Sequence, residues 1–305
     1  MATLYTDIAD LRLAATLAAE IKLILADRSY LWRHPAIAFL GDQAASGSDS
    51  LKVPYAGYGM DPMQPILETG STSDTPLQTS SVTLQVGRQA LQRSVSDLAA
   101  NTGTGVNVAA LAAEAVDAAA GRFTQMVCGA GATFSSVVGT SGSSFTVNNW
   151  FDAQFALQGA YNSGPAVAIL FPKQWADLQT ALRGEASNMI AYSAPSGDRS
   201  LLDLKSAGYQ GTFNGVDVYV SSHVPSANAG ADSAGCMFSA GAIGYAEMSV
   251  NQVRAGSEVI QIGGTPIYSE IDRDPSGALT KIVHNYFCAV AKLQDAMGVA
   301  IVTDR

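Results

Sequence analysis

Apolar and β-branched residues are concentrated in the C-terminal stretch of the chain, where they alternate with turn signals. Residues 267–271 read as a strand, and residues 274–277 hold the Pro and Gly of a tight turn. Residues 280–293 are rich in Ile, Val, Tyr and Phe and contain neither Pro nor Gly. They predict a strand of roughly 45 Å at about 3.3 Å per residue, which is unusually long. A second turn at 295–298 and a last strand at 299–303 complete the pattern.

Both faces of the long strand mix polar and apolar side chains. One face carries Ile282, His284 and Lys292, and the other carries Asn285 and Phe287. A strand with one face on a core and the other in water alternates more regularly. We therefore expect part of each face to meet another element or another copy of the chain.

Two segments in the first half of the chain show the three-and-four spacing of apolar residues that indicates a helix. Residues 7–28 form the first, and the Gly- and Ser-rich stretch after it makes residues 1–48 an arm lying on other structure. Residues 107–128 form the second, with Asn107 as its N-cap and Gly129 as its stop. At about 1.5 Å per residue this helix is roughly 33 Å long, enough to act as a spine.

Prolines interrupt residues 49–86, which lie between the two helices. Strand-like residues 51–55 and 80–86 flank a polar tip, and Pro54 lies within the first strand. Because proline cannot donate to a strand ladder, the segment predicts an edge or a projecting hairpin that reaches roughly 50 Å. Such a loop has little core of its own and suits packing on a neighbour, with a disordered surface loop as the alternative.

A more compact α/β pattern begins near residue 146. Thr146 or Asn148 starts a helix that contains Trp150, Phe151 and Phe155. The continuous apolar run that follows, Ala-Val-Ala-Ile-Leu-Phe, predicts a strand buried on both faces.

Turn signals organise the rest of this block. Pro172 opens a helix that Gly184 ends, and residues 185–200 read as a loop. Asn214-Gly215 between two apolar runs predicts a hairpin. Residues 221–235 predict a polar loop, and residues 240–246 return the chain to its tail.

Composition narrows the functional class. Charged residues make up only 14% of the 305 residues, against the usual quarter or so. A weakly polar surface favours burial in an oligomer, with a secreted or Ala-rich domain as the alternative. The net charge of −9, without a Lys/Arg cluster, argues against a nucleic-acid reader. No apolar run approaches the ~20 residues of a membrane span, and the N-terminus lacks the basic start of a signal peptide.

No set of residues predicts an enzyme, a cofactor site or a metal site. The cysteines Cys128, Cys236 and Cys288 are isolated and read as small buried residues. The three histidines lie far apart, without ligand spacing. Residues 272–277 imitate the opening of a calcium loop, but Val283 stands where the bidentate Glu is needed.

One weak match to a nucleophile motif remains. It is Ala-Asp-Ser-Ala-Gly around Ser233, within the predicted polar loop, with no strand before it and no helix after it. A serine hydrolase that uses Ser233 is therefore kept only as an alternative from a different functional class.

Five motifs in a fixed order carry a resemblance that covers nearly the whole chain. They occupy residues 80–98, 164–179, 211–225, 235–248 and 268–304. In this order the chain resembles the major capsid proteins of tailed bacteriophages, whose Hong Kong 97-type shell fold is shared with encapsulins. The resemblance implies an α+β fold with the following parts: an N-terminal arm at 1–48, an extended loop at 49–86, a peripheral domain at 87–145 and 237–305 with the spine helix at 107–128, and an axial domain at 146–236.

The same resemblance implies a mechanical function. Copies of the chain would form pentamers and hexamers of an icosahedral shell around double-stranded DNA, without sequence-specific contacts. The shell would belong to a virion assembled in the bacterial cytoplasm. Implied partners are a separate scaffolding protein, a portal protein and, as an optional addition, a decoration protein. The alternative within the fold is an encapsulin, a cellular compartment that packs an enzyme.

We expect contacts between copies at aromatic and charged residues of the loop, the spine region and the tail. They are Lys52, Tyr55, Tyr58, Glu68, Arg88, Arg93, Arg122, Glu270, Asp272, Arg273 and Asp274. Some members of the resembling family cross-link a loop lysine to a neighbour. Lys52 is the only lysine of this loop and lies near its base, so we expect no cross-link.

Overall fold

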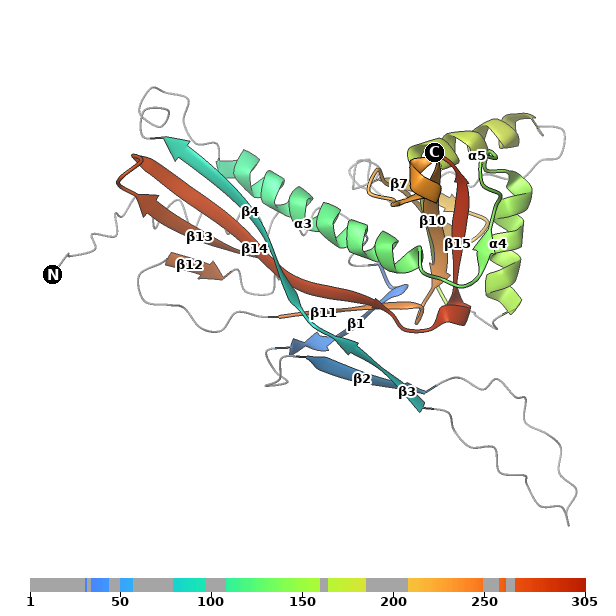
Figure 1. Ribbon diagram of the computed structural model, residues 1–305, viewed down its shortest axis with the longest axis horizontal. Coiled ribbons are helices and arrows are strands. Elements are labelled where there is room, and N and C mark those ends of the chain that lie inside the picture. The colour runs from blue at the N-terminus through green and yellow to red at the C-terminus, as the bar shows by residue number, and fades with distance from the viewer. Residues whose placement is uncertain are drawn as a thin grey trace, which may run out of the picture.

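The computed structural model describes residues 31, 34–43, 50–56, 79–96, 108–159, 164–184, 208–248, 258–261 and 267–305. The predicted helix at 7–28 and the predicted loop at 185–200 lie outside the described residues. The described part is α+β, as predicted. It has an elongated half built around long strands and a compact half that carries two of the three described helices (Figure 1).

The elongated half contains one six-stranded sheet and the long helix α3. The sheet has the order β1-β11-β14-β13-β12, and β4 pairs with the other side of β14. Its elements are β1 (Ile37–Asp42), β4 (Gly87–Ser96), α3 (Val108–Gly131), β11 (Ile243–Glu247), β12 (Glu258–Gln261), β13 (Ile267–Asp274) and β14 (Leu279–Lys292).

The long tail strand is confirmed to within one residue at each end. β14 runs antiparallel to β13, β4 and β11, so one strand organises three others. α3 lies along one face of this ribbon (Figure 1). Helix α3 partly explains why polar and apolar residues mix on β14. Ile282, His284, Tyr286 and Cys288 are all buried on the face that packs against α3.

Helix α3 also joins the two halves of the molecule. Ala115, Ala119 and Phe123 lie on the predicted apolar face and are buried. Val116 and Val127 are buried too, because the C-terminal part of the helix meets β10 (Asp232–Ser239) of the compact half. The small residues along α3 thus let backbone approach from more than one side.

The predicted stop at Gly129 is wrong, since α3 continues to Gly131. A glycine inside a helix costs about 1 kcal/mol relative to alanine, so tertiary contacts must compensate for it. A Cβ at Gly131 would lie 2.4 Å from Cys236 Sγ, which shows how closely the last turn packs on β10. The predicted cap, Asn107, lies outside the described residues.

The compact half is a seven-stranded sheet of order β5-β15-β10-β6-β8-β7, with β9 paired to β10. Its elements are β5 (Val137–Val138), α4 (Val147–Gly159), β6 (Ala166–Leu170), α5 (Pro172–Gly184), β7 (Tyr209–Phe213), β8 (Val216–Val220), β9 (Ser226–Ala227), β10 and β15 (Gly298–Asp304). Its core joins Trp150 of α4, Leu178 of α5 and Phe213 of β7, all fully buried.

Most local predictions for this half are confirmed. The Asn149 N–H donates to Thr146 Oγ1 at 3.3 Å, so Thr146 rather than Asn148 caps α4. Pro172 is the first residue of α5, and β6 is buried at four of its five positions. Asn214 and Gly215 both have positive φ, as the two-residue turn between β7 and β8 requires.

The predicted polar loop at 221–235 is wrong in its second part. Residues 232–235 begin β10 and are buried, because β10 pairs with β15 from the very end of the chain. Asp232 is accommodated there by hydrogen bonds from Ser141 Oγ at 2.6 Å and from the Gly142 N–H at 2.9 Å. Residues 240–246, which the sequence indicated only as the return to the tail, include a turn and then β11, which begins at Ile243.

Strands β4, β1 and β12 of the elongated half were not predicted. β4 alternates polar and apolar residues with many exposed positions, and it was read only as a motif before the spine helix. β1 includes Gly41 and Asp42, which the sequence pattern placed in a loose stretch of the arm. It pairs in parallel with β11, so Leu31, Ala36 and Ile37 are part of the core.

The described ends of the interrupted segment before β4 pair as two antiparallel strands, as a hairpin requires. β2 (Leu51–Ala56) and β3 (Thr79–Leu84) make a separate two-stranded sheet, with Pro54 in register with Ser81. The hairpin extends away from both larger sheets (Figure 1). A two-stranded ribbon alone is marginally stable in water, so its position favours contact with something else.

Candidate assembly surface

The residues expected at contacts between copies gather mainly on the ribbon formed by β4, β14 and β13. Side chains alternate between the two faces of a strand, so the pairing registers assign each residue to a face. Arg93 shares the face covered by α3, because it is in register with the buried Ile282. Arg88 and the acidic residues of β13 lie on the opposite face, which we call the outer face. Its charged residues are Arg88, Glu270, Asp272, Asp274 and Lys281.

Arg88, Arg93 and Arg122 each donate a hydrogen bond to another side chain of the same chain. Arg93 Nε donates to Glu114 Oε1 of α3 at 2.8 Å, an exposed ion pair whose hydrogen bond lowers the pKa of Glu114. Arg122 Nε of α3 donates to Gln89 Oε1 of β4 at 2.9 Å. The bonds of Arg93 and Arg122 thus both link α3 to β4 at the edge of the ribbon. Arg88 Nε donates to Asn285 Oδ1 at 2.7 Å on the outer face.

The turn between β13 and β14 holds an ion pair at the far end of the ribbon. Lys281 Nζ donates to Asp274 Oδ2 at 2.8 Å, and Ser276 Oγ donates to Asp274 Oδ1 at 2.6 Å. These bonds hold the pKa of Asp274 well below its usual range. Lys281 is not among the contact residues predicted from the sequence, and the structure places it beside Asp274.

The remaining predicted contact residues differ in exposure. Asp272 and Arg273 are exposed, and Glu270 is half-buried. Lys52 is exposed on β2, and Tyr55 follows on the same strand. Tyr58 and Glu68 lie outside the described residues.

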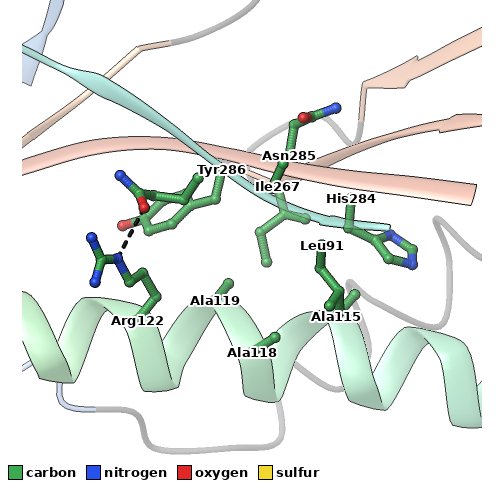
Figure 2. Close-up of a pocket in the computed structure, with 11 residues that line it drawn as sticks. Leu91, Ala115, Ala118, Ala119, Arg122, Ile267, His284, Asn285 and Tyr286 are labelled. Carbon is green, nitrogen blue, oxygen red and sulfur yellow. Dashed lines mark hydrogen bonds between the residues drawn. The ribbon is translucent and has the colours of Figure 1, made fainter. Parts of the chain in front are cut away.

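A cavity of about 190 Å³ separates α3 from the ribbon at mid-length. Figure 2 shows Leu91, Ile267 and His284 pointing from the sheet toward the helix, whose side of the cavity carries three alanines, Ala115, Ala118 and Ala119, and Arg122 at one end. The helix and the sheet are therefore incompletely packed against each other at this position.

His284 is the polar group buried at this cavity. Its Nδ1 lies 2.7 Å from Ser269 Oγ, and its Nε2 has no hydrogen-bond partner among the described residues. Burial lowers the pKa of His284, since charging the imidazole there would remove an ion from water.

Large apolar side chains are exposed on the compact half. Phe155 of α4 is 76% exposed and Phe151, one turn earlier, is 39% exposed. Trp150 and Leu157 point inward from the same helix. The sequence placed all four in one helix. Phe151 and Phe155 are four residues apart and Trp150 and Leu157 are seven apart, so each pair shares one face of the helix, and this spacing is the signal that could have separated the exposed pair from the buried pair.

The structure offers no support for a hydrolase at Ser233. Ser233 is on β10 rather than in a loop, and it is fully buried. The described residues include one hydrogen bond between a histidine and a carboxylate, from His34 Nε2 to Asp217 Oδ2 at 2.9 Å. The Ala36 N–H donates to His34 Nδ1, so both ring nitrogens are used within the fold. Hydrogen bonds led by that of His34 lower the pKa of Asp217 to about 2.

Metal and membrane sites were also considered. Within the described ranges, no group of three or more His, Cys, Asp or Glu side chains is arranged to hold a metal ion. The three cysteines are free thiols and buried, as predicted. None of the helices that the structure describes has both the length and the apolarity to cross a bilayer.

Comparison by sequence identified no relative. No protein-family model matches the chain, and no curated protein matches it.

Comparison by structure gave many matches. A structure of Mycobacterium phage Che8 superposes with a TM-score of 0.58 at 14% identity, covering 90% of this chain and 91% of that chain. The capsid structure of the cyanophage P-SCSP1u gives 0.56 at 12% identity, covering 91% and 89%. The holo-SrpI encapsulin complex of Synechococcus elongatus PCC 7942 gives 0.55 at 10% identity, covering 84% and 83%. The chain therefore has the Hong Kong 97-type fold, which tailed-phage capsid proteins and encapsulins share.

Proposed function

We propose that this chain is the major subunit of an icosahedral capsid, in which copies form pentamers and hexamers around double-stranded DNA. The observation that carries the proposal is the match over about nine tenths of this chain and of both phage chains. A closed shell needs one core fold with adjustable parts, because the same chain must fit pentamers and hexamers. The projecting β2–β3 hairpin suits that role.

The surface of the chain supports burial against other copies. Phe151 and Phe155 expose apolar area on the compact half, and Phe39 does so on the elongated half. Contacts of an obligate kind bury upwards of about 2,000 Å² and are rich in apolar side chains. The net charge of −9 fits a wall that encloses DNA without holding it by many ion pairs.

The same proposal assigns a role to each segment of the chain. Residues 1–48 act as an arm, 49–86 as the extended loop, 146–236 as the axial domain, and the rest as the peripheral domain. The outer-face charges and Arg273 then contact neighbouring copies, as do Lys52 and the loop residues. The function is mechanical and needs no catalytic residue.

Assembly in a host bacterium requires partners beyond the chain itself. We propose a separate scaffolding protein and a portal protein, with a decoration protein as an optional addition. The mature location is the virion.

An encapsulin is the second candidate function, and the likeness to the holo-SrpI complex favours it. In that case the shell would enclose a cargo protein instead of DNA. The content of purified particles separates the two functions, because the shell geometry alone is shared.

The decisive experiment is electron microscopy of the full-length chain, expressed alone and then with its neighbouring genes. Closed icosahedral particles support the shell. Nuclease-protected double-stranded DNA inside them supports the capsid, and a bound protein cargo supports the encapsulin. A chain that stays monomeric at high concentration in both expressions contradicts the proposal.

A further inference from the structure

Two carboxylates stand side by side where four strands of the elongated half meet. The pairing registers place Gly87 of β4, Cys288 of β14, Glu247 of β11 and Asp42 of β1 in one row across the sheet. Residues in register on adjacent strands point to the same face, and strands are about 4.8 Å apart. Asp42 and Glu247 are therefore like charges held next to each other, which destabilises strand pairing while both are ionised.

The surroundings of Glu247 oppose its negative charge. Burial is the main cause that raises the pKa of Glu247, to about 7, and the charge of Asp42 acts in the same direction. Tyr286 Oη donates to Glu247 Oε1 at 3.1 Å, which partly offsets both effects.

The row lies at the root of two extensions. The Val86 N–H, between β3 and β4, donates to Gln43 Oε1 at 3.0 Å, directly after Asp42 at the end of β1. The β2–β3 hairpin thus joins the body beside the strand that follows the N-terminal segment. Figure 1 shows β1, β2 and β3 converging at this part of the molecule.

We propose that Glu247 holds a proton beside Asp42, and that release of this proton loosens β1 from β11 at the root of the β2–β3 hairpin. With the proton bound, the pair carries one negative charge and β1 is held firmly. Without it, two adjacent carboxylates repel each other in a half-buried site. β1 then opens more often, and the base of the β2–β3 hairpin, bonded to Gln43 through Val86, is released with it.

The sign follows from the pKa of Glu247, which is higher in the folded chain than the ordinary value of 4.5. The paired state is therefore most stable below pH 4.5 and loses stability as the pH rises to about 7. Other titratable groups face the pair from each packed element: Tyr286 and Cys288 from β14, and Arg122 from α3, whose charge acts on Cys288. The pKa of Cys288 is raised to about 12, so its thiol stays neutral across this range.

This inference concerns a joint within one chain, and only its meaning for assembly rests on the proposed function. In a shell, such a joint would let the extensions rearrange between neighbours when the local pH changes.

Hydrogen–deuterium exchange of the full-length chain tests the joint. Peptides covering residues 34–43 and 243–248 are followed between about pH 5 and pH 8, after correction for the intrinsic rate of amide exchange. Contact with β1 accounts for part of the rise in the pKa of Glu247. For each pKa unit of that part, we expect β1 to open roughly tenfold more often at the upper end of this pH range than at the lower end. Peptides from β10 and β15 serve as an internal reference.

Three variants separate the carboxyl pair from other causes. Glu247→Gln imitates the protonated side chain and should keep β1 protected at both pH values. Asp42→Asn removes the like charge and should reduce the pH dependence while leaving part of it. Glu270→Gln removes one carboxylate from β13 and should behave like the wild type.

Two results would overturn the inference: protection of residues 34–43 that does not change with pH in the wild type, or unchanged pH dependence in Glu247→Gln. If Glu247→Gln did not fold, Asp42→Asn would decide by the same criterion. Electron microscopy of the same samples reports on shells independently, so a failure of the joint and a failure of the shell are distinguishable.

Discussion

Replacing Phe155 by glutamine should weaken assembly without weakening the folded chain. Phe155 is 76% exposed on α4, so it contributes little to the core of its own chain. Glutamine keeps a good helix former at this position and removes the ring. If copies meet over this face of α4, the variant loses only contacts between copies.

The size of the effect follows from the exposed fractions. Fully burying a phenylalanine contributes about 1.5–3 kcal/mol. Scaled by exposures of 76% and 39%, covering the ring contributes about 2 kcal/mol at Phe155 and about 1 kcal/mol at Phe151. A loss of about 2 kcal/mol per contact raises the concentration needed for assembly roughly 30-fold.

Light scattering against total protein concentration measures this threshold, with negative-stain microscopy to identify closed particles. Thermal unfolding of the unassembled chain supplies the check on folding. Phe151→Gln is the matched variant, one helical turn away, and should give about half of the free-energy loss. Phe213→Ala, in the core of the same half, should instead lower the unfolding temperature.

Two outcomes would refute this reasoning. Unchanged thresholds in both variants would show that this face of α4 is not a contact between copies. A melting temperature several degrees lower for Phe155→Gln would show that the ring packs within its own chain.

Three further predictions concern the folded chain. Gly298→Ala should lose roughly 1–3 kcal/mol in urea unfolding, because its Cβ would lie 2.1 Å from the buried Phe134 ring. Gly129→Ala, where nothing lies within 4 Å, should gain about 0.5–1 kcal/mol, and equal effects would contradict this contrast. The contribution of His284 to stability should fall as the pH drops below 6.5, because burial lowers the pKa of its imidazole. Glu247 acts in the opposite direction over this range, so the test is the difference in urea midpoint between the wild type and His284→Gln. This difference should shift in favour of the variant between pH 7.5 and pH 5, and a constant difference would exclude the imidazole as the source. The three buried thiols should resist iodoacetamide at pH 8, since burial raises the pKa of each one. Mass spectrometry should find three labels only in urea, and rapid labelling of the folded chain would show that it opens.

Elements with local signals could be predicted from the sequence. The turn at Asn214-Gly215, the start of α5 at Pro172 and the buried strand β6 all have the residues expected for them. Each depends on backbone preferences or on burial within a few neighbouring residues. The length of β14 belongs to the same class, because an unbroken β-forming run needs no distant partner to be recognised.

Elements that depend on distant partners could not be predicted. β10 begins at Asp232 because β15 pairs with it, and α3 passes Gly129 because its last turn packs on Cys236. β1 was read as part of a loose arm because its partner, β11, lies about two hundred residues later.

The candidate surface divides in the same way. Sequence identified Arg88, Arg93 and the charged residues of β13, since an ionised side chain marks a surface or an ion pair wherever it falls. Only the tertiary structure decided their partners, among them Glu114 for Arg93 and Lys281 for Asp274. The raised pKa of Glu247 also has this origin, because burial and the nearby Asp42 arise from strand pairing. Periodicity and turn chemistry are properties of adjacent residues, whereas register and burial exist only once distant segments have met.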